Sequence, residues 1–282
     1  MAGCEQAISD TDLSRLRSLI HQQSGIKLDA EKKTMLELRI RPRLRALALT
    51  SFSEYCDFLF GARGQAEEMV PFLDAITTNK TDFFREQLHF EYLSKTALPQ
   101  MVSTGIGMSR PLVVWSAGCS TGEEAYTLAI VLQEYAQAHP GFRFRILATD
   151  LCTEVLEKAN RAVFNTEVVT PVPAELRRKY FLRCRDRESN LVRVVPELRD
   201  LVEFRRLNFM DQDYGVSEQV HAIFCRNVLI YFDRPTQEQI LQKLSRHLAP
   251  GGYAFLGHSE SVHGLNVPLT PIAPALYRRS HV

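Results

Sequence analysis

The chain has 282 residues, 45% hydrophobic and 24% charged, which is typical of a globular protein with one large domain or two unequal ones. Its 34 Lys and Arg residues against 33 Asp and Glu residues give a net charge of +1, so no global charge draws it to nucleic acid or an anionic membrane. The start, MAGCEQAISD, has no leader pattern, and no stretch approaches the ~20 apolar residues of a membrane span. We therefore expect a cytoplasmic protein without membrane insertion or a nucleic-acid partner.

Residues 1–90 have the apolar spacing of helices, which predicts an N-terminal helical domain. Gly25 is the expected stop of the first helix, and Pro71 interrupts a fourth one expected over 65–76. The second helix, within residues 30–47, carries six basic residues against two acidic ones, a local net charge of +4. Four arginines form pairs four residues apart on this helix: Arg39, Arg41, Arg43 and Arg45.

The pattern changes at Pro111, where apolar runs typical of strands begin. Residues 91–282 as a whole are expected to form an α/β domain. The apolar run LVVWSAG, the helical stretch EEAYTLAIVLQEYA and the run FRILATD predict a strand, a helix and a parallel strand. HAIFCRNVLIYF and YAFLGHSE extend the same sheet. Residues from about 164 to 207 alternate like half-exposed strands, which predicts an inserted small antiparallel β subdomain. The six cysteines include no CxxC pair, and we expect no metal.

The turn after the first strand of this domain is the expected ligand site, because ligands of open α/β sheets bind beyond the carboxyl ends of the strands. Gly118 and Gly122 lie in this turn, but AGCSTGEE is not GxGxxG, and two acids open the helix where a pyrophosphate would need bare N–H groups. Glu123 there favours a cationic ligand. Asp150, at the end of the second strand, could accept hydrogen bonds from ribose hydroxyls. Alternatively, Glu123 and Glu124 only complement the helix dipole.

Five sequence blocks together resemble the CheR family of chemotaxis receptor glutamate methyltransferases: TTNKTDFFRE, VWSAGCSTGEEAYTLAI, ILATDLCTEVLEKA, IFCRNVLIYFD and GHSES. They occur in the family's order and span nearly the whole chain. The resemblance implies a Rossmann-like sheet that binds S-adenosyl-L-methionine and releases S-adenosyl-L-homocysteine, with an N-terminal helical domain and an inserted β subdomain. It also implies transfer of the methyl group to glutamate side chains of chemoreceptors.

The resemblance also assigns cofactor contacts to residues of this chain. In the TTNKTDFFRE block, Arg85 suits the amino acid carboxylate of the cofactor, because its planar fork pairs with a carboxylate through two hydrogen bonds. A structural salt bridge is an alternative for Arg226. The full implied set of cofactor contacts is Asn79, Thr81, Arg85, Glu123, Asp150, Asn208, Phe209, Arg226 and Asn227.

No catalytic triad is expected for this reaction, because a glutamate carboxylate, with a pKa of ~4.3, is already an anion at neutral pH and needs no general base. Alignment and exclusion of water can carry such a methyl transfer. Tyr231 is our candidate for orienting the incoming carboxylate. A strand-end aromatic that packs beside Phe232 is an equally good explanation of this tyrosine.

The expected partner is the cytoplasmic helical domain of chemoreceptors, which would recruit the enzyme to receptor arrays at the membrane. The arginines of the second helix, Arg39, Arg41, Arg43 and Arg45, form a basic strip that suits an acidic helix. A solvated face is the alternative. Some family members also hold a C-terminal receptor peptide at the β insertion by adding a strand to its edge. The sequence leaves this open here.

Two other functions remain compatible with the sequence. A methyltransferase could use the same fold on nucleic acid or a small molecule, since fold does not fix function. The near-neutral charge and the lack of a DPPY or NPPY motif argue against this. A degenerate member could instead bind cofactor or receptor without turnover, which the retained Asn79, Arg85, Glu123, Asp150 and Asn227 argue against.

Overall fold

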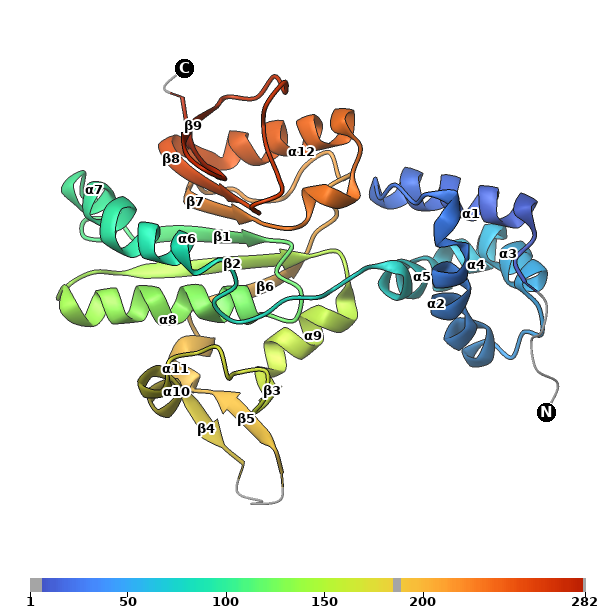
Figure 1. Cartoon of the computed structure of the whole chain (residues 1–282), viewed down its shortest axis with the longest axis horizontal. Coiled ribbons are helices and arrows are strands. Elements are labelled where there is room, and N and C mark those ends of the chain that lie inside the picture. Colours follow the sequence, from blue (N-terminus) through green and yellow to red (C-terminus); the bar gives the residue numbers. More distant parts are fainter. Residues whose placement is uncertain (1–6, 185–188, 281–282) are drawn as a thin grey trace.

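The computed structural model describes residues 7–184 and 189–280 and contains an N-terminal helical domain beside an α/β domain (Figure 1). Ser9 and Ser51 cap the first and third helices with their side-chain oxygens, and Gly25 ends the first helix at a φ of 73°. Pro71 lies inside a short last helix, and Glu68 separates this helix from the one before. The elements are α1 (Asp10–Ser24), η1 (Ala30–Lys32), α2 (Lys33–Ala46), α3 (Phe52–Phe60), α4 (Ala62–Glu67) and α5 (Met69–Ile76).

The boundary between the two domains lies before residue 90. The N-terminal core runs from Ile8 to Ile76 and includes partly buried Leu151 at its edge. Phe83 and Phe90 instead pack in the core of the α/β domain. The segment DFFRE, within the residues 1–90 expected to form helices, is a turn in which Phe84 and Glu86 have positive φ. Helices begin after it: α6 (Gln87–Tyr92), η2 (Leu93–Ala97) and α7 (Leu98–Ser103).

A seven-stranded sheet in the order β6-β2-β1-β7-β8-β10-β9 forms the centre of the α/β domain. The first five strands of that order are parallel, and β10 is antiparallel to both of its neighbours. This confirms the predicted Rossmann-like sheet. The strands are β1 (Leu112–Ala117), β2 (Phe144–Asp150), β6 (Val202–Arg206), β7 (Val220–Cys225), β8 (Leu248–Leu256), β9 (Leu269–Ala273) and β10 (Leu276–Arg279).

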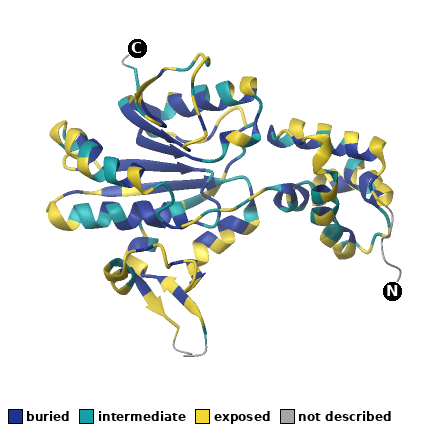
Figure 2. Ribbon diagram, in the orientation of Figure 1, coloured by how far each residue is buried: buried dark blue, intermediate teal, exposed yellow. Residues whose placement is uncertain are grey.

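Helices cover both faces of the sheet, so its central strands are buried (Figure 2). Alternate residues of β1 show this, since Val114 packs in one core with α8, and Trp115 packs in another with α12. The helices of this domain are α8 (Glu123–Ala138), α9 (Thr153–Arg161), α10 (Ala174–Tyr180), α11 (Pro196–Arg199) and α12 (Arg234–His247), with the 3-10 turn η3 (Leu229–Tyr231). No helix in the described part of the chain is long and apolar enough to cross a membrane.

A small antiparallel sheet, β3-β5-β4, protrudes beside α9 and confirms the predicted β subdomain (Figure 1). Its strands are β3 (Val163–Asn165), β4 (Phe181–Arg183) and β5 (Leu191–Val194). The prediction that LVEFRRL belongs to this insertion is wrong, because β6 pairs in parallel with β2 at the edge of the main sheet. In this edge strand Val202 is buried and Phe204 half-buried, whereas Glu203 and Arg205 are exposed, so it alternates like a strand of the subdomain.

Candidate active site

A cavity of about 310 Å³ lies at the carboxyl ends of β1, β2 and β7, against the N-terminal helical domain. Its volume is within the range of small-molecule sites, and its position is the one that open α/β sheets use for ligands. Four stretches supply most of its walls, namely residues 24–35, 76–85, 207–209 and 226–232. The site is therefore built from both domains and from the segment that joins them.

The turn after β1 leaves room for a ligand but offers few free N–H groups. Gly118 has a φ of +90°, and a Cβ there would lie 2.5 Å from Val228 Cγ2, so a side chain would clash. The N–H of Gly118 donates to the Thr149 carbonyl at 2.7 Å, and that of Ser120 donates to Asp150 Oδ2 at 2.8 Å. With these donors engaged, the turn does not form a phosphate cradle.

Asp150 lines the cavity at the end of β2, as the sequence predicts. Its Oδ1 accepts a hydrogen bond from the Cys152 N–H at 3.0 Å, in addition to the bond from Ser120 to Oδ2. Burial raises the pKa of Asp150, and these N–H donors oppose the rise. A carboxylate has about four lone-pair sites, so it can still accept hydrogen bonds from a ligand's hydroxyl groups.

The two acids that open α8 point in different directions. Glu123 is buried and lies outside the cavity lining, where its carboxylate accepts a hydrogen bond from Thr121 Oγ1 at 2.6 Å. Glu124 lines the cavity and also accepts from Ser116 Oγ at 2.6 Å. Burial raises the pKa of both carboxyls, and Arg226 opposes the rise for Glu124. The acid that faces the cavity is thus the neighbour of the one expected.

Arg226 joins three walls of the cavity. Its Nε lies 3.5 Å from Glu86 Oε2 and 3.4 Å from Glu124 Oε2, and its Nη2 donates to the carbonyl of Arg85. The guanidinium also lies over the ring of Phe90, 5.1 Å from the centroid. Nε and Nη1 are buried without a hydrogen-bond partner among the described residues. Arg226 therefore forms the structural salt bridge that the sequence left as an alternative, and it also lines the cavity.

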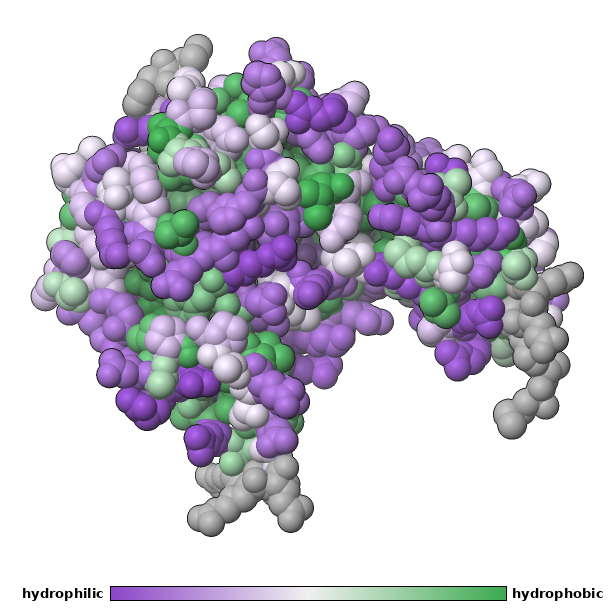
Figure 3. Space-filling model, in the orientation of Figure 1, coloured by the Kyte–Doolittle hydropathy of each residue, from purple (hydrophilic) through white to green (hydrophobic). Residues whose placement is uncertain are grey.

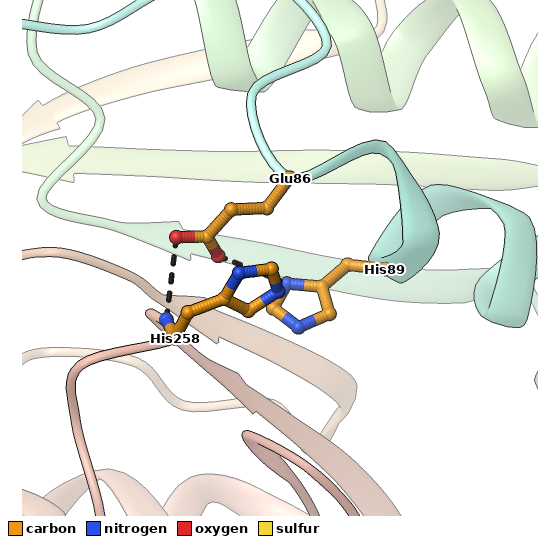
Figure 4. A group of neighbouring side chains, drawn as sticks. All are labelled: Glu86, His89 and His258. Carbon is orange, nitrogen blue, oxygen red and sulfur yellow. Dashed lines mark hydrogen bonds and ion pairs between the residues drawn. The ribbon is translucent and has the colours of Figure 1, made fainter.

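Glu86, His89 and His258 gather behind this arginine (Figure 4). The Glu86 carboxylate accepts from the His258 N–H at 3.2 Å and lies 3.4 Å from His89 Nδ1. Their possible metal-ligating atoms lie within 4.8 Å of one another. A cation there would face the guanidinium of Arg226, which already pairs with the same carboxylate. We interpret the group as part of the charge network around Arg226.

The TTNKT segment closes one side of the cavity, and Asn79, Thr81 and Arg85 all line it. The Asn79 carbonyl accepts a hydrogen bond from Ser120 Oγ at 2.8 Å, which ties the segment to the turn after β1. Arg85 is half-buried, and its Nη1 donates to the Lys80 carbonyl at 3.3 Å. The Arg85 fork is thus held at one corner and faces the cavity.

Asn208 and Phe209 follow β6 and line the opposite side of the cavity. Asn208 Nδ2 donates to the Gln23 carbonyl of α1 at 2.6 Å, so this amide also connects the two domains. Phe209 is buried and packs at 6.3 Å, centroid to centroid, from Phe232. An aromatic edge at this place suits a flat ring such as adenine.

One buried carboxylate that the sequence analysis missed organises the turn after β7. Glu260 Oε2 accepts from the N–H groups of Asn227 at 2.9 Å and Gly257 at 2.6 Å, and Oε1 accepts from that of Ile230 at 3.3 Å. Asn227, at a φ of 58°, and Tyr231 both line the cavity. Glu260 stands in the GHSES block, so that motif supports the site without lining it.

The basic strip of α2 lies outside the cavity lining, and two of its arginines face their own domain. Arg39 donates to the carbonyls of Ile76 and Thr77. Arg43 forms two hydrogen bonds with the buried Glu68, at 2.8 and 2.7 Å.

The other two arginines of the strip have no such partners among the described residues. Arg45 is exposed, and Arg41 is half-buried with its guanidinium 6.0 Å from the ring centroid of Phe52. The structure thus divides the strip into two arginines that hold α2, a half-buried Arg41 and an exposed Arg45.

A sheet with β10 antiparallel beside β8, a glycine turn with engaged N–H groups and an aspartate at the end of β2 fit a nucleoside cofactor without phosphate groups. The family comparison gives the class, an S-adenosylmethionine-dependent methyltransferase. Residues 79–273 match the family model of the CheR methyltransferase S-adenosylmethionine-binding domain, and residues 11–77 match that of the CheR methyltransferase all-alpha domain. The chain belongs to the CheR methyltransferase family.

Similar proteins are named chemotaxis protein methyltransferases. The one from Salmonella typhimurium is 42% identical over 92% of this chain and 86% of its own length. Chemotaxis protein methyltransferase 2 of Pseudomonas aeruginosa is 40% identical over 89% and 86%, and the one from Borreliella burgdorferi is 34% identical over 97% and 95%. The relatedness therefore spans both domains.

The cavity fits S-adenosylmethionine, the cofactor of this family. This ligand has no phosphate, in agreement with the engaged N–H groups of the turn. Its sulfonium would suit the acidic side near Glu124, its ribose would suit Asp150, and its carboxylate would suit Arg85.

Proposed function

We propose that this enzyme methylates glutamate side chains in the cytoplasmic helical domain of chemoreceptors and forms glutamyl methyl esters. The observation that carries the proposal is the position of the basic N-terminal helices at the cavity, because Lys32 of η1 and Met35 of α2 both line it. Arg45 lies ten residues, or about 15 Å, further along α2 than Met35, so an acidic receptor helix that meets Arg45 can extend to the cavity. Binding of this kind recruits the enzyme to receptor arrays.

The residues around the cavity position the acceptor rather than activate it. When bound, S-adenosylmethionine supplies an electrophilic methyl group. A glutamate carboxylate is ionised at neutral pH, so no residue has to remove a proton. Tyr231 lines the cavity on the turn after β7, which supports its proposed role as a hydrogen-bond donor to one carboxylate oxygen. Phe232 and Phe209 exclude water on that side.

The test is methylation of a purified cytoplasmic receptor fragment with S-adenosylmethionine carrying a labelled methyl group. We expect the label on the fragment to be released as volatile methanol by mild base, as an ester requires. A receptor fragment in which the modified glutamates are replaced by alanine serves as the control and remains unlabelled. A base-stable methyl product would contradict the proposal, and S-adenosylhomocysteine binding without any turnover would favour a non-catalytic binding module.

The β subdomain is proposed as the place where a receptor C-terminal peptide adds a strand. β4 is an edge strand of the small sheet, and Leu182 and Leu191 are 52% and 44% exposed on it and on its neighbour β5. Hydrophilic side chains cover much of the face shown in Figure 3, and apolar areas lie among them. An open edge with apolar side chains suits strand addition.

Calorimetric titration with the C-terminal peptide of the same receptor tests this second site. Leu182→Glu should weaken peptide binding at least tenfold while leaving the affinity for S-adenosylhomocysteine unchanged. Leu88→Glu, at an exposed leucine outside the subdomain, is the matched control. Equal peptide affinity of the wild type and Leu182→Glu would place the peptide elsewhere.

A further inference from the structure

The segment between α1 and η1 crosses the mouth of the cavity in a fixed position. Ile26 packs against both the N-terminal core and the catalytic core, and Leu28 is buried. Arg17 Nε donates to the Leu28 carbonyl at 2.7 Å. Between Ile26 and Leu28, the N–H of Lys27 donates to the carbonyl of Tyr231 at 2.9 Å. The backbone of Lys27 is therefore attached to the turn that carries Tyr231.

Lys27 is exposed and is one of the residues that line the cavity. Its ammonium has no ion pair or hydrogen bond with any residue that the structure describes. Three acids line the cavity: Glu124 is engaged by Arg226 and Ser116, Asp150 is engaged by backbone N–H groups, and the exposed Asp82 forms no ion pair with Lys27. Lys27 is thus an uncompensated cation with a fixed base at the cavity entrance.

We infer that Lys27 is a specificity-determining residue that receives the acceptor carboxylate beside Tyr231. This inference rests on the proposed function and adds the group that selects an acidic side chain at the mouth. A lysine ammonium on a flexible four-carbon stem can follow a carboxylate as it enters, and it has three donors to share with it. The ammonium attracts the carboxylate but also withdraws electron density from it, so its effect falls on acceptor binding rather than on the methyl-transfer step.

The experiment compares steady-state methylation of a cytoplasmic receptor fragment by the full-length wild type, Lys27→Met and Lys27→Arg. Lys27→Met keeps most of the stem and removes the charge. We expect its KM for the fragment to rise about tenfold, with kcat and the Kd for S-adenosylhomocysteine within twofold of wild type. Lys27→Arg should stay within threefold of the wild-type KM. Lys158→Met, at an exposed lysine of α9 outside the cavity, is the matched control.

The salt dependence provides a second measurement. The wild-type KM should rise with ionic strength more steeply than that of Lys27→Met, because one screened attraction is missing in the variant. A KM for Lys27→Met within twofold of wild type, or an equal loss in Lys158→Met, would overturn the inference. A wild type that binds S-adenosylhomocysteine and forms no base-labile ester would instead overturn the proposed function, and the inference with it.

Discussion

The guanidinium of Arg226 lies 3.5 Å from the carboxylate of Glu86, measured from Nε to Oε2, at the point where the TTNKT segment meets the end of β7. The arginine side chain is only 2% exposed. A buried charge is stable only with partners, and Glu86 and Glu124 supply the opposite charges here. Burial acts to raise the pKa of Glu86, but Arg226 and the donors of His258 and Asn227 outweigh it and keep the pKa below its usual value.

Glu86→Gln should weaken cofactor binding, because it removes one of the two counter-charges of Arg226 and loosens the side of the cavity that carries Arg85. The amide oxygen can still accept from the Asn227 side chain and the His258 N–H. We expect the Kd for S-adenosylhomocysteine to rise about tenfold, which corresponds to about 1.4 kcal/mol. Calorimetric titration measures it, beside Glu91→Gln at a half-buried residue of α6 that lies outside the cavity lining. An unchanged Kd would show that Glu86 is dispensable for the site.

The stability of the protein should fall on acidification partly because of His89. Burial lowers the pKa of His89 to about 4, Arg226 adds to this, and Glu86 opposes it. Below the ordinary histidine pKa of 6.5 the unfolded chain takes up a proton that the folded chain refuses. The stability from this residue is complete above about pH 6.5 and is lost as the pH falls toward about 4.

The loss amounts to up to about 2 kcal/mol at about pH 5. His89→Leu should therefore lose less stability than the wild type between about pH 7.5 and pH 5, as measured by urea denaturation. His263→Gln, at an exposed histidine, should behave as the wild type does. A pH dependence in His89→Leu equal to that of the wild type would assign the effect to other groups.

The sheet and the first turn of the site could be predicted from the sequence because their signals are local. Buried parallel strands are continuous apolar runs; Gly118 directly follows one of them, and Asp150 is the last residue of another. Glu86, Glu260 and Lys27 could not be predicted in the same way. Their roles depend on contacts with residues far along the chain, such as that between Lys27 and Tyr231.

The direction in which a side chain points was the second feature that could not be predicted from the sequence. Glu123 and Glu124 are adjacent at the start of one helix, and only the packing of α8 decides which of them faces the cavity. Arg43 and Arg45 belong to the same basic strip, yet one is paired inside the domain and the other is exposed. Charge spacing predicts a basic helix but not which of its charges are free.

Arg43→Ala should destabilise the N-terminal domain, because it leaves the Glu68 carboxylate buried without its cation. Glu68 is 2% exposed at its side chain and also accepts a hydrogen bond from Tyr55 at 3.0 Å. Breaking such a pair costs about 3 kcal/mol, and thermal denaturation should show a clear decrease in Tm. Arg45→Ala should keep the wild-type Tm and instead reduce receptor methylation. Equal Tm values for the two variants would contradict the division of the strip.

Glu260→Gln should affect the site although Glu260 lies outside the cavity lining. The amide has one acceptor oxygen and an NH₂ group, so at least one of the N–H groups of Asn227, Gly257 and Ile230 loses its acceptor. A lost buried hydrogen bond costs about 1–3 kcal/mol, so kcat/KM for the receptor fragment should fall about tenfold or more.

A role in positioning the turn predicts more than lost activity. Amide hydrogen exchange in residues 226–231 of Glu260→Gln should accelerate, while exchange in β1 and β2 stays as in the wild type. Glu157→Gln, at an exposed residue of α9, should change neither measurement. If exchange accelerates equally throughout the sheet, Glu260 stabilises the whole domain, and the geometry of Tyr231 must be held by other contacts, of which the bond from the Lys27 N–H is the first to test.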